Sequence, residues 1–128
     1  MCIRDRDMGW DLKKNKLKIS GMWSIINPHK SSNQRHTHPN SFLSSAYYIK
    51  APKNCGHLVF HDPRSAATYR TAKTRKVSNL NSDEYNIVPR EGLLVLFPSY
   101  LDHSVNGNLS NNERIVISFN IYLISSSN

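Results

Sequence analysis

The sequence predicts an all-β domain, a jelly roll of the double-stranded β-helix (cupin-like barrel) class. About eight short strand-like segments follow one another, separated by turns rich in Gly, Pro and Asn. No long amphipathic helical pattern and no internal repeat accompanies them. Two histidines separated by one residue precede an apolar segment, and another histidine follows a later apolar segment. This order is typical of a metal site inside such a barrel.

Length and composition indicate one folded domain. A sequence of 128 residues is long enough to bury a single hydrophobic core. A hydrophobic fraction of 38% with 9% aromatic residues is typical of a folded chain. No apolar run of about 18 residues is present, and the first residues lack the apolar stretch of a signal peptide. We therefore expect a cytoplasmic protein without a membrane partner. The two cysteines, Cys2 and Cys55, predict no disulfide framework.

We expect the barrel to occupy residues 10–124. Residues 1–9 share no pattern with the rest of the chain and are interpreted as a non-native or disordered leader, and residues 125–128 as a frayed tail. On this interpretation the chain lacks the N-terminal part of a longer natural protein. Residues 65–86 are polar, basic and poor in apolar side chains, which predicts a long surface loop or a lid.

Two strands are expected before the histidine pair. The alternation of Leu17 and Ile19 among lysines predicts an edge strand, because exposed lysines discourage pairing with other chains. Gly21 is expected to end this strand. Residues 22–26 form the next predicted strand, which the following Asn-Pro pair stops.

The remaining strands are predicted from apolar runs between turn residues. Aromatic and apolar residues predict buried strands over residues 42–49 and 93–97, the second of them fully apolar and in the core. Shorter strands are expected over residues 57–61 and 85–89, and a long alternating strand over residues 114–124. We expect the apolar face of the last strand to close the barrel with Ile115, Ile117, Phe119, Ile121 and Leu123. Its other face carries the functional groups, and consists of Arg114, Val116, Ser118, Asn120 and Tyr122.

The histidine pair is the strongest candidate for a functional site. In an extended backbone, residues i and i+2 point to the same face, so the imidazoles of His36 and His38 project together. His103, which follows the apolar run over residues 93–97, is the predicted third ligand. Imidazole nitrogens are common ligands of divalent first-row metal ions, so these residues predict a metal site.

Several segments, taken in order, resemble a known family. They are Trp23, His36-Thr37-His38-Pro39, Ser44–Ile49, Gly56–Arg64, Gly92–His103 and Arg114–Asn120. Together they resemble the Fe(II)/2-oxoglutarate-dependent oxygenases related to prolyl hydroxylases, a group frequent in marine bacteria and their phages. The resemblance runs from about Trp23 to Tyr122.

The resemblance implies that the chain is a dioxygenase of the hydroxylase type. Such an enzyme holds one Fe(II) ion by three side chains and uses 2-oxoglutarate and O2 as cosubstrates. It hydroxylates its substrate while 2-oxoglutarate loses CO2 and becomes succinate. We expect a small-molecule or peptidyl substrate, and a location in the cytoplasm of a bacterium or of a phage-infected cell.

The expected ligand set departs from the family pattern. The family places a carboxylate two residues after its first histidine, where this chain has His38. We therefore expect a three-histidine site, which also suits Zn, Cu or Ni. A second register would pair His38 with the amide of Asn40, a poor ligand for a divalent ion. A third register would recruit the carboxylate of Asp62 or Asp102.

The resemblance also implies a binding site for 2-oxoglutarate. Arg114 is the natural anchor for its distal carboxylate, because a guanidinium offers two parallel donors and stays charged in a pocket. Tyr48 matches the family tyrosine whose phenol reaches the same carboxylate, and Ser118 adds a hydroxyl on the strand face of Arg114. The residues expected to line the substrate pocket or to support the ligands are Asn120, His61 and Asn40.

A cupin-like barrel that binds metal without oxidation is the main alternative function, since His-x-His also opens cupin motifs. In cupins the distal histidine comes soon after a Pro-x-Gly turn. Here His103 lies much farther beyond the turn at Gly92, which favours the hydroxylase.

The net charge of +8 supports another alternative, a nucleic-acid-binding module. Five of the 17 basic residues fall within residues 64–76, with no acid among them. Only Tyr69 offers a ring for base stacking there, which makes this function the weaker prediction. A further alternative is a metal-free relative of the oxygenases that serves as a phage structural protein.

Overall fold

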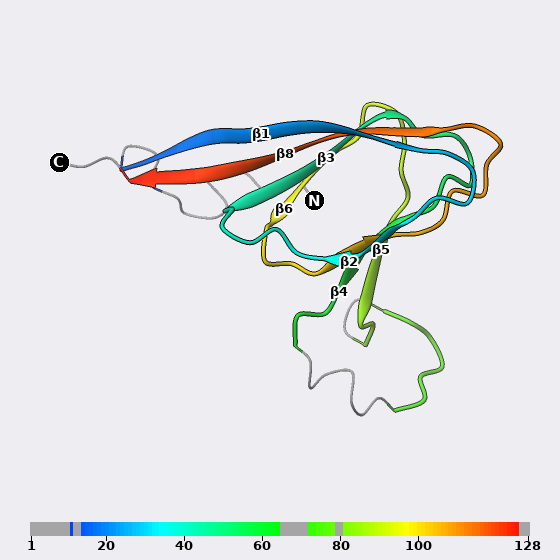
Figure 1. Ribbon diagram of the computed structural model, residues 1–128. Coiled ribbons are helices and arrows are strands. Elements are labelled where there is room, and N and C mark those ends of the chain that lie inside the picture. Colours follow the sequence, from blue (N-terminus) through cyan, green and yellow to red (C-terminus); the bar gives the residue numbers. More distant parts are fainter. Residues whose placement is uncertain (1–10, 12–13, 65–71, 79–80, 126–128) are drawn as a thin grey trace.

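The computed structural model describes residues 11, 14–64, 72–78 and 81–125, and these form eight strands and no helix (Figure 1). The strands make two four-stranded antiparallel sheets, and the all-β prediction is confirmed. The predicted leader over residues 1–9, the tail beyond residue 125 and part of the predicted loop lie outside the described residues. None of the described residues belongs to a helix long and apolar enough to cross a membrane.

The two sheets form the two layers of a jelly roll. The larger sheet has the order β1-β8-β3-β6 and the smaller sheet the order β2-β7-β4-β5. The larger sheet consists of β1 (Asn15–Asn27), β8 (Arg114–Ser125), β3 (Leu43–Lys50) and β6 (Leu94–Pro98). The smaller sheet consists of β2 (Asn33–His36), β7 (His103–Val105), β4 (Leu58–His61) and β5 (Glu84–Ile87).

The first strand is continuous, and the prediction that Gly21 ends it is wrong. β1 pairs with β8 along its whole length, with a register shift between Ile19 and Gly21. Such a bulge adds one residue to a strand and bends it without interrupting the ladder. The two predicted segments therefore form one edge strand.

The core lies between the sheets and consists of Ala46, Tyr48, Leu58, Phe60, Val95, Phe97 and Val116. On β8 the buried side chains are Arg114, Val116 and Ser118, whereas the alternating isoleucines are only half-buried on the opposite face. The expectation that the apolar face closes the barrel is therefore wrong. Alternation tells which side chains share a face, but it does not tell which face points inwards.

The predicted core strand β6 is also only half inside. Val95 and Phe97 are buried, but the side chain of Leu94, on the opposite face of β6, is 44% exposed. Side chains alternate along a strand, so Leu94 points away from the face that buries Val95 and Phe97. An unbroken apolar run thus does not require burial on both faces.

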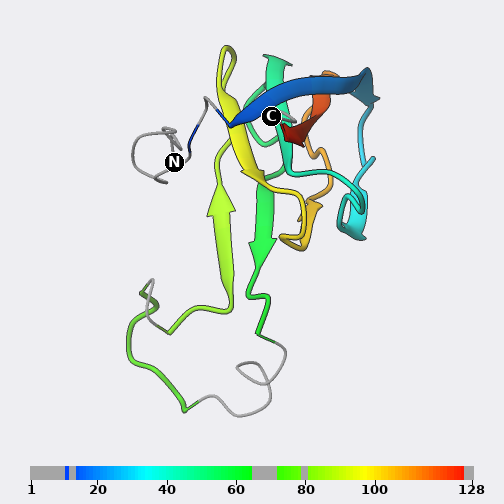
Figure 2. The ribbon, with the colours of Figure 1, turned by 90° about the vertical axis from the view of Figure 1, so that its left-hand side faces the viewer.

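The strands β4 and β5 form a hairpin arm that projects from the barrel (Figure 2). The backbone N–H of Asp62 donates to the carbonyl of Asp83 at 2.8 Å and continues the pairing beyond the strands. The described residues 72–78 form neither helix nor strand, in keeping with the predicted loop, and Lys73, Arg75 and Lys76 are exposed there.

One turn next to the barrel interior requires glycine. Gly56 has φ of +87°, and a Cβ atom there would collide with the backbone carbonyls of Asn106 and Gly107. This close approach lets the backbone N–H of Asn106 donate to the carbonyl of His57 at 3.0 Å. The turn therefore fixes the loop after β7 against the loop before β4.

We expect Gly56→Ala to lower the free energy of unfolding by more than about 2 kcal/mol, because the new methyl meets rigid backbone at a positive φ. Urea unfolding followed by circular dichroism measures this. Gly21→Ala is the matched control, since nothing lies within 4 Å of a Cβ there. Equal stability of the two variants would contradict the role assigned to Gly56.

Candidate metal centre

Three histidines, from β2, the loop after β2, and β7, meet at one point. His36 ends β2 and lies directly opposite His103, which begins β7. His38 follows two residues later, and its backbone N–H donates to the carbonyl of Ser99 at 2.9 Å. One imidazole nitrogen from each of the three lies within 4.8 Å of the others. The geometry therefore brings together the three residues that the sequence predicts as ligands.

Backbone carbonyls orient two of the imidazole rings. The Nδ1 of His36 lies 2.6 Å from the carbonyl oxygen of Gln34, and the Nδ1 of His103 lies 2.9 Å from that of Leu101. A carbonyl can only accept a hydrogen bond, so Nδ1 of each ring carries the proton and donates. Nε2 is then left with a free lone pair, as a metal ligand requires.

The surroundings of His38 and His103 favour their neutral forms. Burial and, to a lesser extent, the neighbouring His36 and His38 lower the pKa of His103 to about 4, although the hydrogen bond to the Leu101 carbonyl opposes the shift. Burial, and then the charge of His36, also lower the pKa of His38. Both rings are therefore unprotonated near neutral pH and can donate a lone pair to a metal ion.

The carboxylates considered as alternative ligands are held elsewhere. Asp102 accepts a hydrogen bond at 2.6 Å from Nε of Arg35, and Asp62 is bound by Arg64 through two nitrogens. Neither carboxylate belongs to the histidine cluster. Asn40 sits in a turn with φ of 62° and is exposed. Among the described residues, the donor set at this point is three imidazoles.

A cavity of about 190 Å³ opens beside the histidines and reaches into the barrel. It is lined by the three histidines and by Tyr48, Arg114 and Ser118, the residues predicted to bind 2-oxoglutarate. This volume corresponds to roughly six water molecules. The cavity thus connects the histidine cluster to the one arginine that lies on the inner face of β8.

Arg114 is fully buried with part of its hydrogen-bonding capacity unused. Its Nη1 donates to the carbonyls of Cys55 and Asn106, the second at 3.1 Å. Its Nε and Nη2 have no partner among the described residues. Burial lowers the pKa of Arg114, and the neighbouring Tyr48 opposes this shift. A buried, unpaired charged donor is costly, so the N–H groups of these two free nitrogens are suited to binding an anion.

Tyr48 and Ser118 add neutral donors to the same cavity. Burial raises the pKa of Tyr48 to about 12, although the charge of Arg114 opposes the shift. The phenol therefore keeps its proton and can donate a hydrogen bond to an anion. Ser118 is 7% exposed on the inner face of β8, two residues from Val116.

Sequence reasoning missed the groups that position this cavity. The carbonyls of Cys55 and Asn106 hold Arg114, and backbone carbonyls leave no signal in a sequence. Trp23 stacks on His38 with ring centroids 6.0 Å apart and lines the cavity. The sequence predicted Trp23 only as part of the family resemblance, and its place in the cavity follows from the register between β1 and β8, which sets it opposite Ser118.

The three residues predicted around the substrate pocket do not line this cavity. Asn120 accepts a hydrogen bond from Ser44 at 2.8 Å, farther along β8. His61 lies on β4, where its Nε2 is 2.9 Å from the hydroxyl of Ser104. Asn40 is in the exposed turn already described.

Comparison with known families gives a match over most of the chain. A family model described as "Putative 2OG-Fe(II) oxygenase" matches residues 21–120, a span that contains the three histidines and Arg114. No curated protein matches the chain.

Several solved structures have a similar fold. An oxidoreductase of the 2OG-Fe(II) oxygenase family from Burkholderia pseudomallei shares 14% sequence identity with a TM-score of 0.65, over 84% of this chain and 45% of that one. A prolyl-4-hydroxylase from Pseudomonas putida shares 17% sequence identity with a TM-score of 0.57. The match covers 79% of this chain and 51% of the hydroxylase. HygX from Streptomyces hygroscopicus, with nickel and 2-oxoglutarate bound, shares 11% sequence identity with a TM-score of 0.58. The match covers 83% of this chain and 57% of HygX. The chain spans about half the length of these proteins.

The lowered pKa of His103 predicts how the stability of the metal-free protein depends on pH. The folded state disfavours the protonated ring of His103. Its contribution to the free energy of unfolding is therefore complete above the ordinary pKa of 6.5 and is lost as pH falls towards about 4. We expect a loss of about 2–3 kcal/mol in the free energy of unfolding over this interval. Urea unfolding of chelator-treated protein at several pH values measures it.

His103→Asn is the control for this titration, because it removes the imidazole and keeps a side-chain N–H for the Leu101 carbonyl. The difference in stability between wild type and variant should change between pH 6.5 and 4.5. Parallel curves would show that His103 does not titrate as described.

Proposed function

This chain belongs to the 2OG-Fe(II) oxygenase family, and on that basis we propose that it binds Fe(II) and 2-oxoglutarate and oxidises a substrate with O2. The family uses Fe(II) as its metal and 2-oxoglutarate and O2 as cosubstrates. One observation carries the proposal for this chain: the unpaired donors of buried Arg114 share a cavity with three clustered histidines.

His36, His38 and His103 would hold the metal, His36 and His103 through their Nε2 atoms. The fixed Nδ1–H groups of His36 and His103 leave the Nε2 atoms available, which fits a first-row divalent ion. When bound, Fe(II) supplies the activation of O2 that couples loss of CO2 from 2-oxoglutarate to oxidation of a substrate C–H bond. The protein residues would bind the metal ion and 2-oxoglutarate, orient them and exclude water.

Charge balance favours a dianionic partner at this site. Three neutral imidazoles leave the charge of a divalent ion uncompensated, and Arg114 adds another positive charge on the same cavity. A small dicarboxylate can place one end beside the histidines and the other against the guanidinium. The cavity volume of about 190 Å³ is compatible with such a ligand.

The distal carboxylate would be bound by three side chains. Nε and Nη2 of Arg114 offer two donors to it, the geometry that carboxylates accept best. The protonated phenol of Tyr48 and the hydroxyl of Ser118 supply further donors in the same cavity. The carbonyls of Cys55 and Asn106 hold Nη1 and so fix the orientation of the guanidinium.

The three-histidine donor set also supports a second candidate, a barrel that binds Zn, Cu or Ni without oxidation. The two candidates differ in what they require of Arg114, since only 2-oxoglutarate chemistry needs a carboxylate anchor in the barrel. We further propose a cytoplasmic location, where 2-oxoglutarate is available, and a small-molecule or peptidyl substrate.

Anaerobically purified, Fe(II)-loaded protein should release succinate from 2-oxoglutarate when exposed to O2, even without the physiological substrate. His103→Ala should reduce the rate to background and the bound metal by at least about tenfold, because it removes a buried ligand. His57→Ala, at an exposed histidine outside the cavity, is the matched control. Metal bound tightly by the three histidines without succinate release would favour the non-oxidative barrel, and absence of metal binding would reject both candidates.

Arg114→Lys should weaken 2-oxoglutarate binding at least about tenfold and leave metal affinity within about twofold, because lysine keeps the charge but loses the paired donors. Calorimetric titration of 2-oxoglutarate into anaerobic, Zn-loaded protein measures this without turnover. Arg90→Lys, at an exposed arginine, is the control. Unchanged affinity in Arg114→Lys would remove Arg114 from the binding site.

A further inference from the structure

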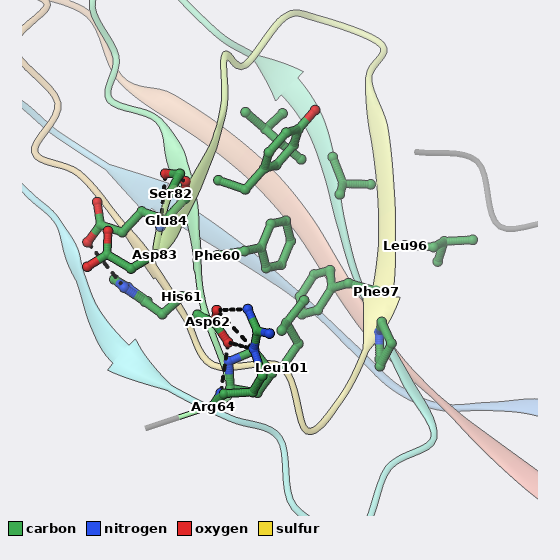
Figure 3. A pocket seen from close by; sticks show the side chains of 15 residues that line it. Phe60, His61, Asp62, Arg64, Ser82, Asp83, Glu84, Leu96, Phe97 and Leu101 are labelled. Carbon is green, nitrogen blue, oxygen red and sulfur yellow. Dashed lines mark hydrogen bonds and ion pairs between the residues drawn. The ribbon is translucent and has the colours of Figure 1, made fainter. Parts of the chain in front are cut away.

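A second, larger cavity of about 430 Å³ lies between β6, the last strand of the larger sheet, and the hairpin arm of β4 and β5 (Figure 3). Four consecutive residues of β6, residues 95–98, line it. Because alternate side chains of a strand point to opposite faces, a cavity that reaches all four runs along the edge of β6. A cavity of roughly 150 Å³ admits benzene, so this one has room for two apolar side chains of that size.

Apolar side chains form most of the walls of this cavity. Phe60 and Phe97 lie side by side between the arm and β6, with ring centroids 4.9 Å apart (Figure 3). Tyr85, on β5, also lines the cavity and is 57% exposed. An exposed aromatic residue beside an apolar cavity is typical of a protein interface, where tyrosines often dominate the binding energy.

The charged residues around the cavity do not select an ion. Asp62 accepts hydrogen bonds from Nε and Nη2 of Arg64, so that pair is neutral as a unit. Glu84 lies 3.3 Å from Nδ1 of His61. In Figure 3, Asp83 and Glu84 lie beside His61 and point away from the aromatic pair. An occupant is therefore recognised by its apolar groups and by its backbone.

The backbone of β6 offers unused hydrogen-bonding groups along this cavity. Opposite residues of an antiparallel pair alternate between exchanging two hydrogen bonds and exchanging none. The N–H of Tyr48 donates to the carbonyl of Leu93 at 3.0 Å, so in this register the odd-numbered residues of β6 bond to β3. The N–H and C=O groups of Leu94 and Leu96 therefore point away from β3, to the side where no described strand lies.

The other three sheet edges carry features that hinder the addition of a strand. β1 has a bulge and the exposed Lys16 and Lys18, and β2 has four residues and a register shift. On β5 the Ser82 hydroxyl donates to the Glu84 carbonyl at 2.5 Å and accepts from the Glu84 N–H at 3.3 Å. Such features are usual at sheet edges, because unpaired backbone groups recruit other chains. β6 has no charged residue and no register shift, and its one proline, Pro98, is its last residue.

We propose that β6 and this cavity bind an extended peptide segment of another protein, which adds to the larger sheet as a further strand. Its backbone pairs with Leu94 and Leu96, and two alternate apolar side chains enter the cavity. In this mode of recognition, main-chain hydrogen bonds give affinity and pockets for alternate side chains give specificity. The cavity contains none of the three clustered histidines, and the proposal does not rest on the oxygenase function.

A second copy of this chain suits the cavity less well than a peptide does. If two copies paired through β6, the inward side chains of each strand would be Val95 and Phe97. These are 5% and 4% exposed because they are already buried in the core of their own barrel, so they are not free to fill the cavity of the other copy. A peptide has no such core, and its inward side chains are available.

The probe is a blocked peptide with alternating apolar side chains, acetyl-Thr-Leu-Thr-Phe-Thr-amide, titrated into chelator-treated protein and followed by heteronuclear NMR. The amides of Leu94 and Leu96 should exchange at least about tenfold more slowly at saturation, because they become hydrogen-bonded. The amide of Asn86, on the outer edge of β5, is the internal control and should not change. Replacing Leu and Phe of the peptide by Ser should weaken binding at least about tenfold, because the cavity stays unfilled. Protection of Asn86 instead, or equal affinity of the two peptides, would overturn the proposal.

N-methylated peptides separate backbone pairing from side-chain contact. Alternate residues of a strand direct their N–H groups to opposite edges, so only one edge of the peptide faces β6. One peptide carries methyl groups on the nitrogens of Leu and Phe, and the other on those of the last two Thr residues. Whichever way the peptide runs, we expect one of the two to bind at least about tenfold more weakly than the other. Equal affinities would show that the peptide does not add as a strand and would overturn the proposal.

Leu96→Pro tests the edge from the side of the protein. It removes an N–H that faces the peptide but no bond to β3, and proline is tolerated at such edge positions. Binding should fall at least about tenfold, whereas the matched control Leu96→Thr, which keeps the N–H, should stay within about threefold. Circular dichroism verifies that both variants are folded. Undiminished binding to folded Leu96→Pro would overturn the proposal.

The protein without peptide tests the competing occupant. Light scattering should show a monomer, and the exchange of the Leu94 and Leu96 amides should not depend on protein concentration. Dimer formation that protects these two amides would show that a second copy occupies the edge, and would overturn the proposal.

Discussion

The burial of one positive charge is the constraint on which the interior of this barrel depends. Arg114 is completely inaccessible at the start of β8, and the described residues pair only Nη1 of its guanidinium. Neither the core of Leu58, Phe60 and Val116 nor the surrounding strands can supply an anion to the other nitrogens. Such an arrangement is unfavourable for stability alone, because an incompletely paired buried charge costs several kcal/mol. The proposed binding of a carboxylate in the cavity would supply the missing partner and offset this cost.

The strand register then decides which groups share the cavity with that charge. His36 faces His103 across β2 and β7, and Trp23 faces Ser118 across β1 and β8. Each pair joins residues far apart in sequence, and a slip of one residue would turn every member to the opposite face. Before the bulge, the odd-numbered Ile19 pairs with Ile121, on the outer face of β8. After the bulge, the odd-numbered Trp23 pairs with Ser118, on the inner face. A rigid antiparallel framework thus holds side chains that no local segment could bring together.

The sequence was sufficient for the class of fold and for the three histidines, because these follow from local patterns. The spacing of His36 and His38 requires only that the backbone be extended, and apolar runs between turn residues predict strands. The inward face of β8, the exposure of Leu94 and the partners of Arg114 could not be obtained in this way. They depend on the order of strands in the sheets and on backbone carbonyls, which are properties of the assembled chain. Arg114 was predicted from the resemblance to oxygenases and not from a local pattern.

Within the described part of the chain no carboxylate joins the clustered histidines, and this changes the charge of the site rather than its geometry. The nearby Asp102 is paired with Arg35, so it braces β2 against β7 and does not neutralise a metal ion. With three neutral rings on one side and Arg114 on the other, the cavity gains its negative charge from the ligand. A dianion would then bind more strongly than at a site that already contains a carboxylate, and a metal ion alone less strongly. Metal and 2-oxoglutarate should therefore bind cooperatively, each raising the affinity of the other by the same factor.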